Sequence, residues 1–382
     1  MAASSYHVRD IFALPDGTAK LDVMERRKIV EGMVKSAGPE GFKEGANAHT
    51  STISFVEEAA VCFVFFWMMG GPFIVLFLLL YTAIFSPITH LLALIALVAF
   101  LSTHPLPDCG AAIAKSWFAQ ATYKYFSYRF VWSDDAVDQI ESLPLYIGAG
   151  APHGVMPFSN ILSISAINSY GYHKVSPTNG HAQKQAEGGG SLYEGRKFRG
   201  AAASALFRTP LLRYFTATGC IDVSAKEITK AVGKGFSIGI VVDGIAGIFR
   251  NNHDDEVVAI KDRKGLAKLA LRTGTPLVAA YSVGNTEVFR AGFDPWGGME
   301  WLSRKLQASL FFLWGRWYLP VPMRRNVALL FGKPIMVKKK APEDITQADV
   351  DEIHAKLLAS MREIFDQHKC HLGIGHKKLV FE

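Results

Sequence analysis

A single uncharged stretch constrains this chain more than any other feature. From Ala59 to Pro107 the sequence contains no Lys, Arg, Asp or Glu. A helix that crosses a bilayer needs roughly 20 apolar residues, so the stretch is long enough for two limbs. Ser86-Pro87 marks the break between them, because proline lacks a backbone donor and disfavours helix at the preceding residue. We therefore expect a transmembrane or re-entrant helical hairpin within residues 53–107.

The two limbs differ in length. The first, about Ala59 to Phe85, is long enough to cross, whereas Ile88 to Leu101 is short for a full crossing. The hairpin therefore either crosses twice or re-enters, and both ends lie on one side. The alternative is a very apolar buried hairpin of a soluble protein. Basic residues flank the stretch and predict that its ends face the cytosol; they are Arg26, Arg27, Lys28, Lys35 and Lys43 before it, and Lys115, Lys124 and Arg129 after it.

Charge and cysteine content exclude several classes of protein. The formal net charge is +7, but neither a zinc-finger spacing nor an aromatic RNA-binding strand is present, so we expect no nucleic-acid partner. A basic membrane protein suits the anionic cytoplasmic leaflet or a polyphosphate ligand. The four cysteines, Cys62, Cys109, Cys220 and Cys370, are far apart, which argues against disulfides and a zinc site and favours a reducing compartment.

Beyond Asp108 the pattern changes to short apolar runs that alternate with amphipathic stretches. Such alternation predicts an α/β domain with a mostly parallel sheet over residues 108–370. A polar segment at 1–52 and the hairpin precede this domain, and a C-terminal tail at 371–382 follows it. A capping box at Thr346 and Asp349 starts a last helix. Expected strands are Pro144–Ala149, Ile238–Val242, Pro276–Ser282 and Val327–Phe331, and expected helices are Ser159–Tyr170, Lys226–Val232 and Lys264–Arg272.

The strongest local signal for chemistry is a histidine that directly follows a predicted strand. His153 lies between Pro152 and Gly154, after Leu145–Gly148. The carboxyl ends of strands in α/β sheets are where ligands bind, and the turn residues hold the ring rigidly. Histidine can take a proton from a hydroxyl near neutral pH, so we expect His153 to be a general base. A turn histidine without a role is the alternative.

Two further segments belong to the same predicted edge. Asp243-Gly244 ends a predicted strand, and Arg263-Lys264-Gly265 opens a predicted helix. Basic side chains at a helix N-terminus suit phosphate groups. An ordinary turn and a solvated helix start are the alternatives.

Two other patterns offer alternative sites. His173 and His181 lie in a Gly-rich region without a third ligand nearby, which favours surface histidines and no metal site. Ser237 lies in Gly235–Gly239, which matches the G-x-S-x-G pattern of serine hydrolases. That motif needs a strand before the serine, and here the predicted strand follows it. A membrane-bound serine esterase that uses Ser237 is thus an alternative of another class.

Several segments, in order along the chain, resemble the type-2 diacylglycerol acyltransferase family, which includes monoacylglycerol acyltransferases and wax synthases. The family's H-P-H-G or E-P-H-S is similar to Ala151–Gly154. Its G-G-x-x-E reads Asp243–Gly247, so the glutamate position holds Gly247. Other matching segments are Arg213–Phe215 with Gly219–Ser224, Asp262–Gly274, which resembles R-x-R-K-G-F-x-K-L-A-L-x-x-G, and Tyr281–Glu287, which resembles Y-x-F-G-E-x-E with Asn285 in place of one glutamate.

The resemblance implies a glycerolipid-acyltransferase-like domain that moves an acyl group from acyl-coenzyme A to the free hydroxyl of diacylglycerol. No cofactor is expected, since acyl-coenzyme A is a co-substrate. His153 would be the base, and Asp243 would replace the aspartate of the His-x-x-x-x-Asp motif in related enzymes, where this chain has Phe158. The substrate-binding residues would be Pro152, Gly154, Arg263, Lys264 and Gly265.

The resemblance also implies a location and leaves alternatives open. We expect the endoplasmic reticulum membrane, with a cytosolic catalytic domain, lipid-droplet association, and the bilayer as a partner. Monoacylglycerol or a fatty alcohol is the alternative acceptor. Because the glutamates are missing, an inactive lipid-binding relative is a further alternative, and homo-oligomerisation is left open.

Overall fold

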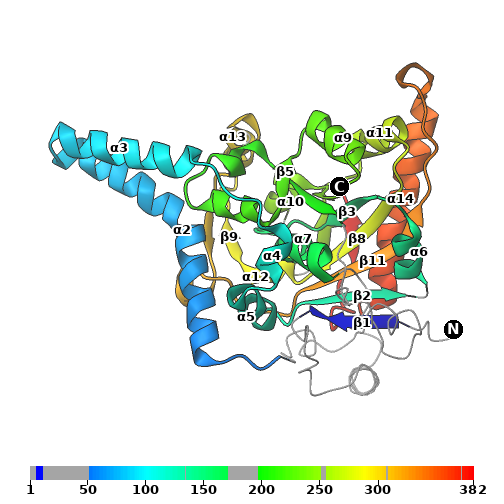
Figure 1. Ribbon diagram of the computed structural model, residues 1–382, viewed down its shortest axis with the longest axis horizontal. Coiled ribbons are helices and arrows are strands. Elements are labelled where there is room, and N and C mark those ends of the chain that lie inside the picture. Colours follow the sequence, from blue (N-terminus) through cyan, green and yellow to red (C-terminus); the bar gives the residue numbers. More distant parts are fainter. Residues whose placement is uncertain are drawn as a thin grey trace, which may run out of the picture.

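An eight-stranded sheet forms the centre of the protein (Figure 1). The computed structural model describes residues 6–11, 51–133, 135–170, 197–250, 255–306, 309–370 and 372–382. The strand order is β1-β2-β11-β8-β3-β6-β4-β5. Strands β8, β3, β6, β4 and β5 run parallel, whereas β11 and β2 run in the opposite direction. The strands are β1 (Tyr6–Asp10), β2 (Arg129–Ser133), β3 (Ile147–Ala151), β4 (Phe198–Ala202), β5 (Cys220–Asp222), β6 (Ser237–Val241), β8 (Leu277–Val283) and β11 (Ala328–Ile335).

Helices cover both faces of this sheet. Along β8, Val278 and Ala280 belong to one hydrophobic core, and Leu277 and Ala279 belong to the other. Successive side chains of a strand point to opposite faces, so a strand buried on both sides reads as one continuous apolar run. The predicted α/β class and the four predicted strands are therefore confirmed. One core contains residues of α5 (Trp117–Tyr125) and α7 (Phe158–Tyr170), and the other contains residues of α9 (Ala225–Gly233), α11 (Gly265–Thr273) and α14 (Gln347–His368).

The hairpin consists of two helices, and the break between them lies at Ser86-Pro87, as predicted. Helix α2 (Phe55–Phe85) begins at a capping box formed by Ser54 and Glu57, and α3 (Ile88–Thr103) follows Pro87. Among the described residues, α2 is the one helix long and apolar enough to cross a membrane. Its buried side chains all lie before Pro72, where Gly70 and Gly71 pack closely against Pro320 and Leu211. The rest of α2 and most of α3 project from the domain, and the end of α3 contacts it through Arg213 (Figure 1).

The first and the last strands, β1 and β12, both pair with strands of the domain. Strand β1 pairs with β2, so the polar N-terminal segment contributes an edge strand. The segment expected as a tail contains β12 (Leu379–Phe381), which pairs in parallel with β7 (Glu256–Val258). It is therefore part of the fold. The basic residues before the hairpin, together with His173 and His181, lie outside the described residues.

Candidate active site

Three neighbouring strands end at the same edge of the sheet. Because β8, β3 and β6 are adjacent and parallel, the residues that follow them are brought together. His153 follows β3, Asp243 follows β6 and Asn285 follows β8. This is the edge where parallel sheets bind ligands.

Asn285 holds the loop that contains His153 through two side-chain hydrogen bonds. The Asn285 side chain is fully buried, and its Nδ2 donates to the Pro152 carbonyl at 3.1 Å. Its Oδ1 accepts from the backbone N–H of Ser159, in the first turn of α7, at 2.9 Å. Gly154 has a φ of 62°, and a Cβ there would lie 2.4 Å from the Asn285 carbonyl oxygen. Only glycine fits at this point of the loop, which explains why Gly154 follows the histidine.

The sequence patterns do not predict a functional role for Asn285, which stands where the resembled pattern has a glutamate. The signal that identifies it is its place directly after β8, which matches the place of His153 after β3.

The tautomer of the His153 ring follows from its hydrogen bond. Nδ1 lies 2.9 Å from the Gly154 carbonyl oxygen. A carbonyl oxygen only accepts, so Nδ1 is the nitrogen that bears the proton, and Nε2 presents a lone pair. Burial lowers the pKa of His153 to about 4, which keeps the ring neutral at pH 7. A neutral ring whose Nε2 lone pair has no partner in the described part of the chain has the form that a general base needs.

Asp243 supports the loop and does not touch the imidazole. Its carboxyl group is fully buried, and Oδ2 accepts from the backbone N–H of His153 at 3.0 Å. Oδ1 has no hydrogen-bond partner within the described parts of the chain. Burial raises the pKa of Asp243 to about 7, against the effect of the His153 hydrogen bond. The expected replacement of an orienting aspartate is therefore wrong in its geometry, because the Gly154 carbonyl takes that role.

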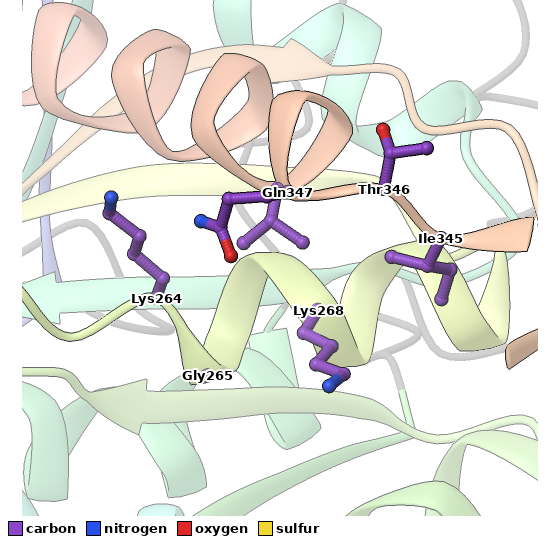
Figure 2. A pocket seen from close by; sticks show the side chains of 7 residues that line it. Lys264, Gly265, Lys268, Ile345, Thr346 and Gln347 are labelled. Carbon is purple, nitrogen blue, oxygen red and sulfur yellow. The ribbon is translucent and has the colours of Figure 1, made fainter. Parts of the chain in front are cut away.

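The basic triplet is divided between two places. Arg263 Nη1 donates to the Asp243 carbonyl at 3.0 Å, so this guanidinium lies at the His153 edge. Lys264 instead forms an ion pair of 2.7 Å with Asp351 of α14. Figure 2 shows Lys264 and Gly265 in a groove between α11 and the start of α14, together with Lys268 and Gln347. The side chains of Arg263 and Lys264 thus have different partners and do not point to one place.

A buried ion pair from the C-terminal segment supports the same edge. Lys377 Nζ lies 2.8 Å from Glu256 Oε1, and both side chains are at most 4% exposed. Glu256 also accepts from the Tyr281 hydroxyl at 2.9 Å and from Thr286 Oγ1 at 3.1 Å. Tyr281 pairs with Ala151, the residue before Pro152. Every member of this cluster has a partner, as burial of charge requires.

Ser237 lies at the other edge of the sheet. It is the first residue of β6, and its Oγ accepts from the Tyr146 backbone N–H at 3.3 Å. The register of β3 with β6 places it roughly 20 Å from His153 along the strand direction. Ser237 is 1% exposed. This placement argues against the esterase alternative. The described residues also contain no group of His, Cys, Asp and Glu that fits a metal ion.

Aromatic side chains connect the site to the hairpin. Phe158 starts α7 directly after the His153 loop, and its ring lies 5.1 Å from that of Phe65 on α2. The ring of Phe289, which follows α12 (Asn285–Val288), lies 6.1 Å from the ring of Phe158. The first half of α2 therefore packs beside the candidate site.

The family model described as "Diacylglycerol acyltransferase" matches residues 81–382. The chain belongs to the diacylglycerol acyltransferase family. The predicted family is therefore confirmed, and the match extends from the last turn of α2 to the end of the α/β domain, without β1.

Individual relatives agree with this membership. Over 251 residues the chain is 28% identical to diacylglycerol O-acyltransferase 2 of Xenopus tropicalis, covering 62% of this chain and 64% of the relative. Over 192 residues it is 34% identical to the Mus musculus protein of that name, covering 46% and 48%. The chain thus spans about half to two thirds of the length of these relatives. It is 27% identical over 352 residues to human diacylglycerol O-acyltransferase 2-like protein 6, covering 86% and 97%.

Among solved structures, the 1-acyl-sn-glycerophosphate acyltransferase PlsC of Thermotoga maritima is similar with a TM-score of 0.37 and 11% identity, covering 81% of this chain and 97% of that one.

Proposed function

We propose that this protein transfers an acyl group from acyl-coenzyme A to the free hydroxyl of diacylglycerol and so forms triacylglycerol. The observation that carries the proposal is the His153 ring at the carboxyl edge of the sheet, with Nδ1 bound to the Gly154 carbonyl and Nε2 without a hydrogen-bond partner among the described residues. Family membership and the names of the relatives support the substrate class. The hydrogen bonds that hold the His153 loop also favour a catalyst over an inactive lipid-binding relative.

In the proposed mechanism, Nε2 of His153 removes the proton from the acceptor hydroxyl. The oxygen attacks the thioester carbon, and backbone N–H groups of the loop stabilise the oxyanion. Collapse of the tetrahedral intermediate breaks the carbon–sulfur bond. The proton on Nε2 passes to the leaving thiolate, so the histidine returns to its starting form.

Coenzyme A phosphates need a cation at the same edge. We assign this contact to Arg263, because its guanidinium is bound to the Asp243 carbonyl. Lys264 is a weaker candidate because Asp351 pairs with it. The Pro152 and Gly154 positions shape the loop under the acceptor.

The bilayer is the proposed partner of the hairpin. Residues 72–85 of α2 extend about 21 Å and the 16 residues of α3 about 24 Å, at 1.5 Å per residue. Both are shorter than a hydrocarbon core of about 30 Å. We infer that the hairpin re-enters from the cytosolic face of the endoplasmic reticulum without crossing, a geometry that also suits a lipid droplet.

His153→Ala tests the function directly. Membranes of a host that lacks neutral-lipid synthesis are incubated with labelled acyl-coenzyme A and with diacylglycerol, monoacylglycerol or a fatty alcohol. We expect wild type to produce triacylglycerol and His153→Ala to lose at least about 100-fold in rate, the lower end of the range for a general base. The exposed His376→Ala is the matched control. Full activity of His153→Ala would overturn the mechanism, and preference for another acceptor would reassign the substrate.

A further inference from the structure

The first turn of α10 (Gly244–Phe249) brings two positions into the same space. Gly247 is buried, and its backbone N–H donates to the Asp243 carbonyl at 3.2 Å. A Cβ at position 247 would lie 2.0 Å from Asp243 Oδ2 and 2.4 Å from its Cγ. The Asp243 carboxyl group therefore occupies the volume in which a side chain of residue 247 would begin.

The sequence of this turn is an inversion of the pattern that it resembles. The pattern G-G-x-x-E has a small residue first and a carboxyl group four residues later, whereas this chain has Asp243 first and Gly247 last. Residues i and i+4 of a helix share one face, so either position can fill the same volume. Both cannot do so together, because of the contact at 2.0 Å.

We propose that Asp243 is a positioning residue that supplies, from one helical turn earlier, the carboxyl group that the family pattern places at position 247. Its Oδ2 holds the backbone N–H of His153 at 3.0 Å and so fixes the loop. Arg263 holds the Asp243 carbonyl from the other side at 3.0 Å. The apparent loss of the glutamate is thus an exchange of position. This inference rests on the proposed role of His153, because the carboxyl group acts through the loop.

Moving the carboxyl group tests the proposal. Asp243→Gly removes the acceptor of the His153 N–H, and we expect kcat to fall about 100-fold, as for a misplaced catalytic group. Gly247→Glu alone should also lower activity, because two side chains compete for one volume. The double variant Asp243→Gly/Gly247→Glu should regain most of the rate. Asp243→Gly/Gly247→Met is the matched control, since methionine has a similar length but does not offer a carboxyl oxygen.

Hydrogen–deuterium exchange of residues 150–158, measured by mass spectrometry, reads out the loop independently of activity. We expect fast exchange in Asp243→Gly and in the methionine control, and slow exchange in wild type and in the glutamate double variant. A folded glutamate double variant with an unprotected loop would overturn the proposal, as would equal rescue by methionine. If wild type transfers no acyl group, the proposed function fails. The hydrogen–deuterium exchange of the loop still shows whether a carboxyl group at position 247 can replace that of Asp243.

Discussion

At the scale of single residues, the imidazole of His153 is held in one tautomer without a carboxylate on the ring. A backbone carbonyl selects the tautomer of His153, and the position five residues later holds Phe158. That phenylalanine packs against Phe65, so the position has an apolar role. The buried carboxyl group of Asp243 acts on the backbone of the loop instead.

The raised pKa of Asp243 has a consequence for stability. Its carboxyl has an ordinary pKa of 3.8 and a folded pKa of about 7, so the folded state binds the proton more tightly. The resulting stability is fully present below pH 3.8 and is lost as the pH rises through 7. A shift of this size corresponds to roughly 4 kcal/mol in the free energy of unfolding.

Asp243→Asn should remove that pH dependence while keeping an oxygen that accepts from His153. We expect the variant to unfold at a higher temperature than wild type at pH 8 and to lose this advantage towards pH 5. Thermal unfolding of both proteins in the same detergent, at several pH values, measures the difference. Parallel curves over this range would contradict the assigned pKa.

At the scale of elements, the loop after β3 and the turn after β8 form one unit. Gly154 lies on the Asn285 carbonyl, and the Asn285 side chain bonds the residues on both sides of the histidine. Such a unit tolerates little change, because each part is fixed by the other.

Gly154→Ala should disrupt this unit. The new Cβ would lie 2.4 Å from the Asn285 carbonyl oxygen at a φ of 62°. We expect a loss of about 1–3 kcal/mol in the free energy of unfolding and a larger loss in acyl transfer, because the loop moves with the base. Gly233→Ala, with open space around its Cβ, is the control and should stay active. Wild-type activity in Gly154→Ala would show that the loop geometry is not needed.

At the scale of the whole molecule, the hairpin is fixed to the domain at both limbs. Leu211 packs on Gly71 at the bend of α2. Arg213 Nη1 donates to the Leu101 carbonyl at 3.1 Å, near the end of α3. The exposed limbs therefore leave the domain in one direction, and the buried half of α2 stays beside the site (Figure 1).

The hairpin tip should be inaccessible from both sides of the membrane. In a variant without native cysteines, Ser86→Cys should resist a membrane-impermeant thiol reagent in sealed microsomes, from the cytosolic and from the lumenal side, until detergent is added. Exposed Lys378→Cys should react from the cytosolic side at once. Labelling of Ser86→Cys from the lumen would show that the limbs cross.

Local patterns along the sequence determined the strands, the break at Pro87, the capping box of α14 and the presence of His153 after a strand. These features depend on hydrogen bonds and periodicities within a few residues, and the structure confirms them. Only the tertiary structure decided which groups meet. In the folded protein Asn285 contacts the His153 loop, and Lys264 pairs with Asp351 of α14. The Asp243 carboxyl group fills the volume next to residue 247. The physical reason is that side-chain direction and close contact between distant segments are set by packing, which no local pattern contains.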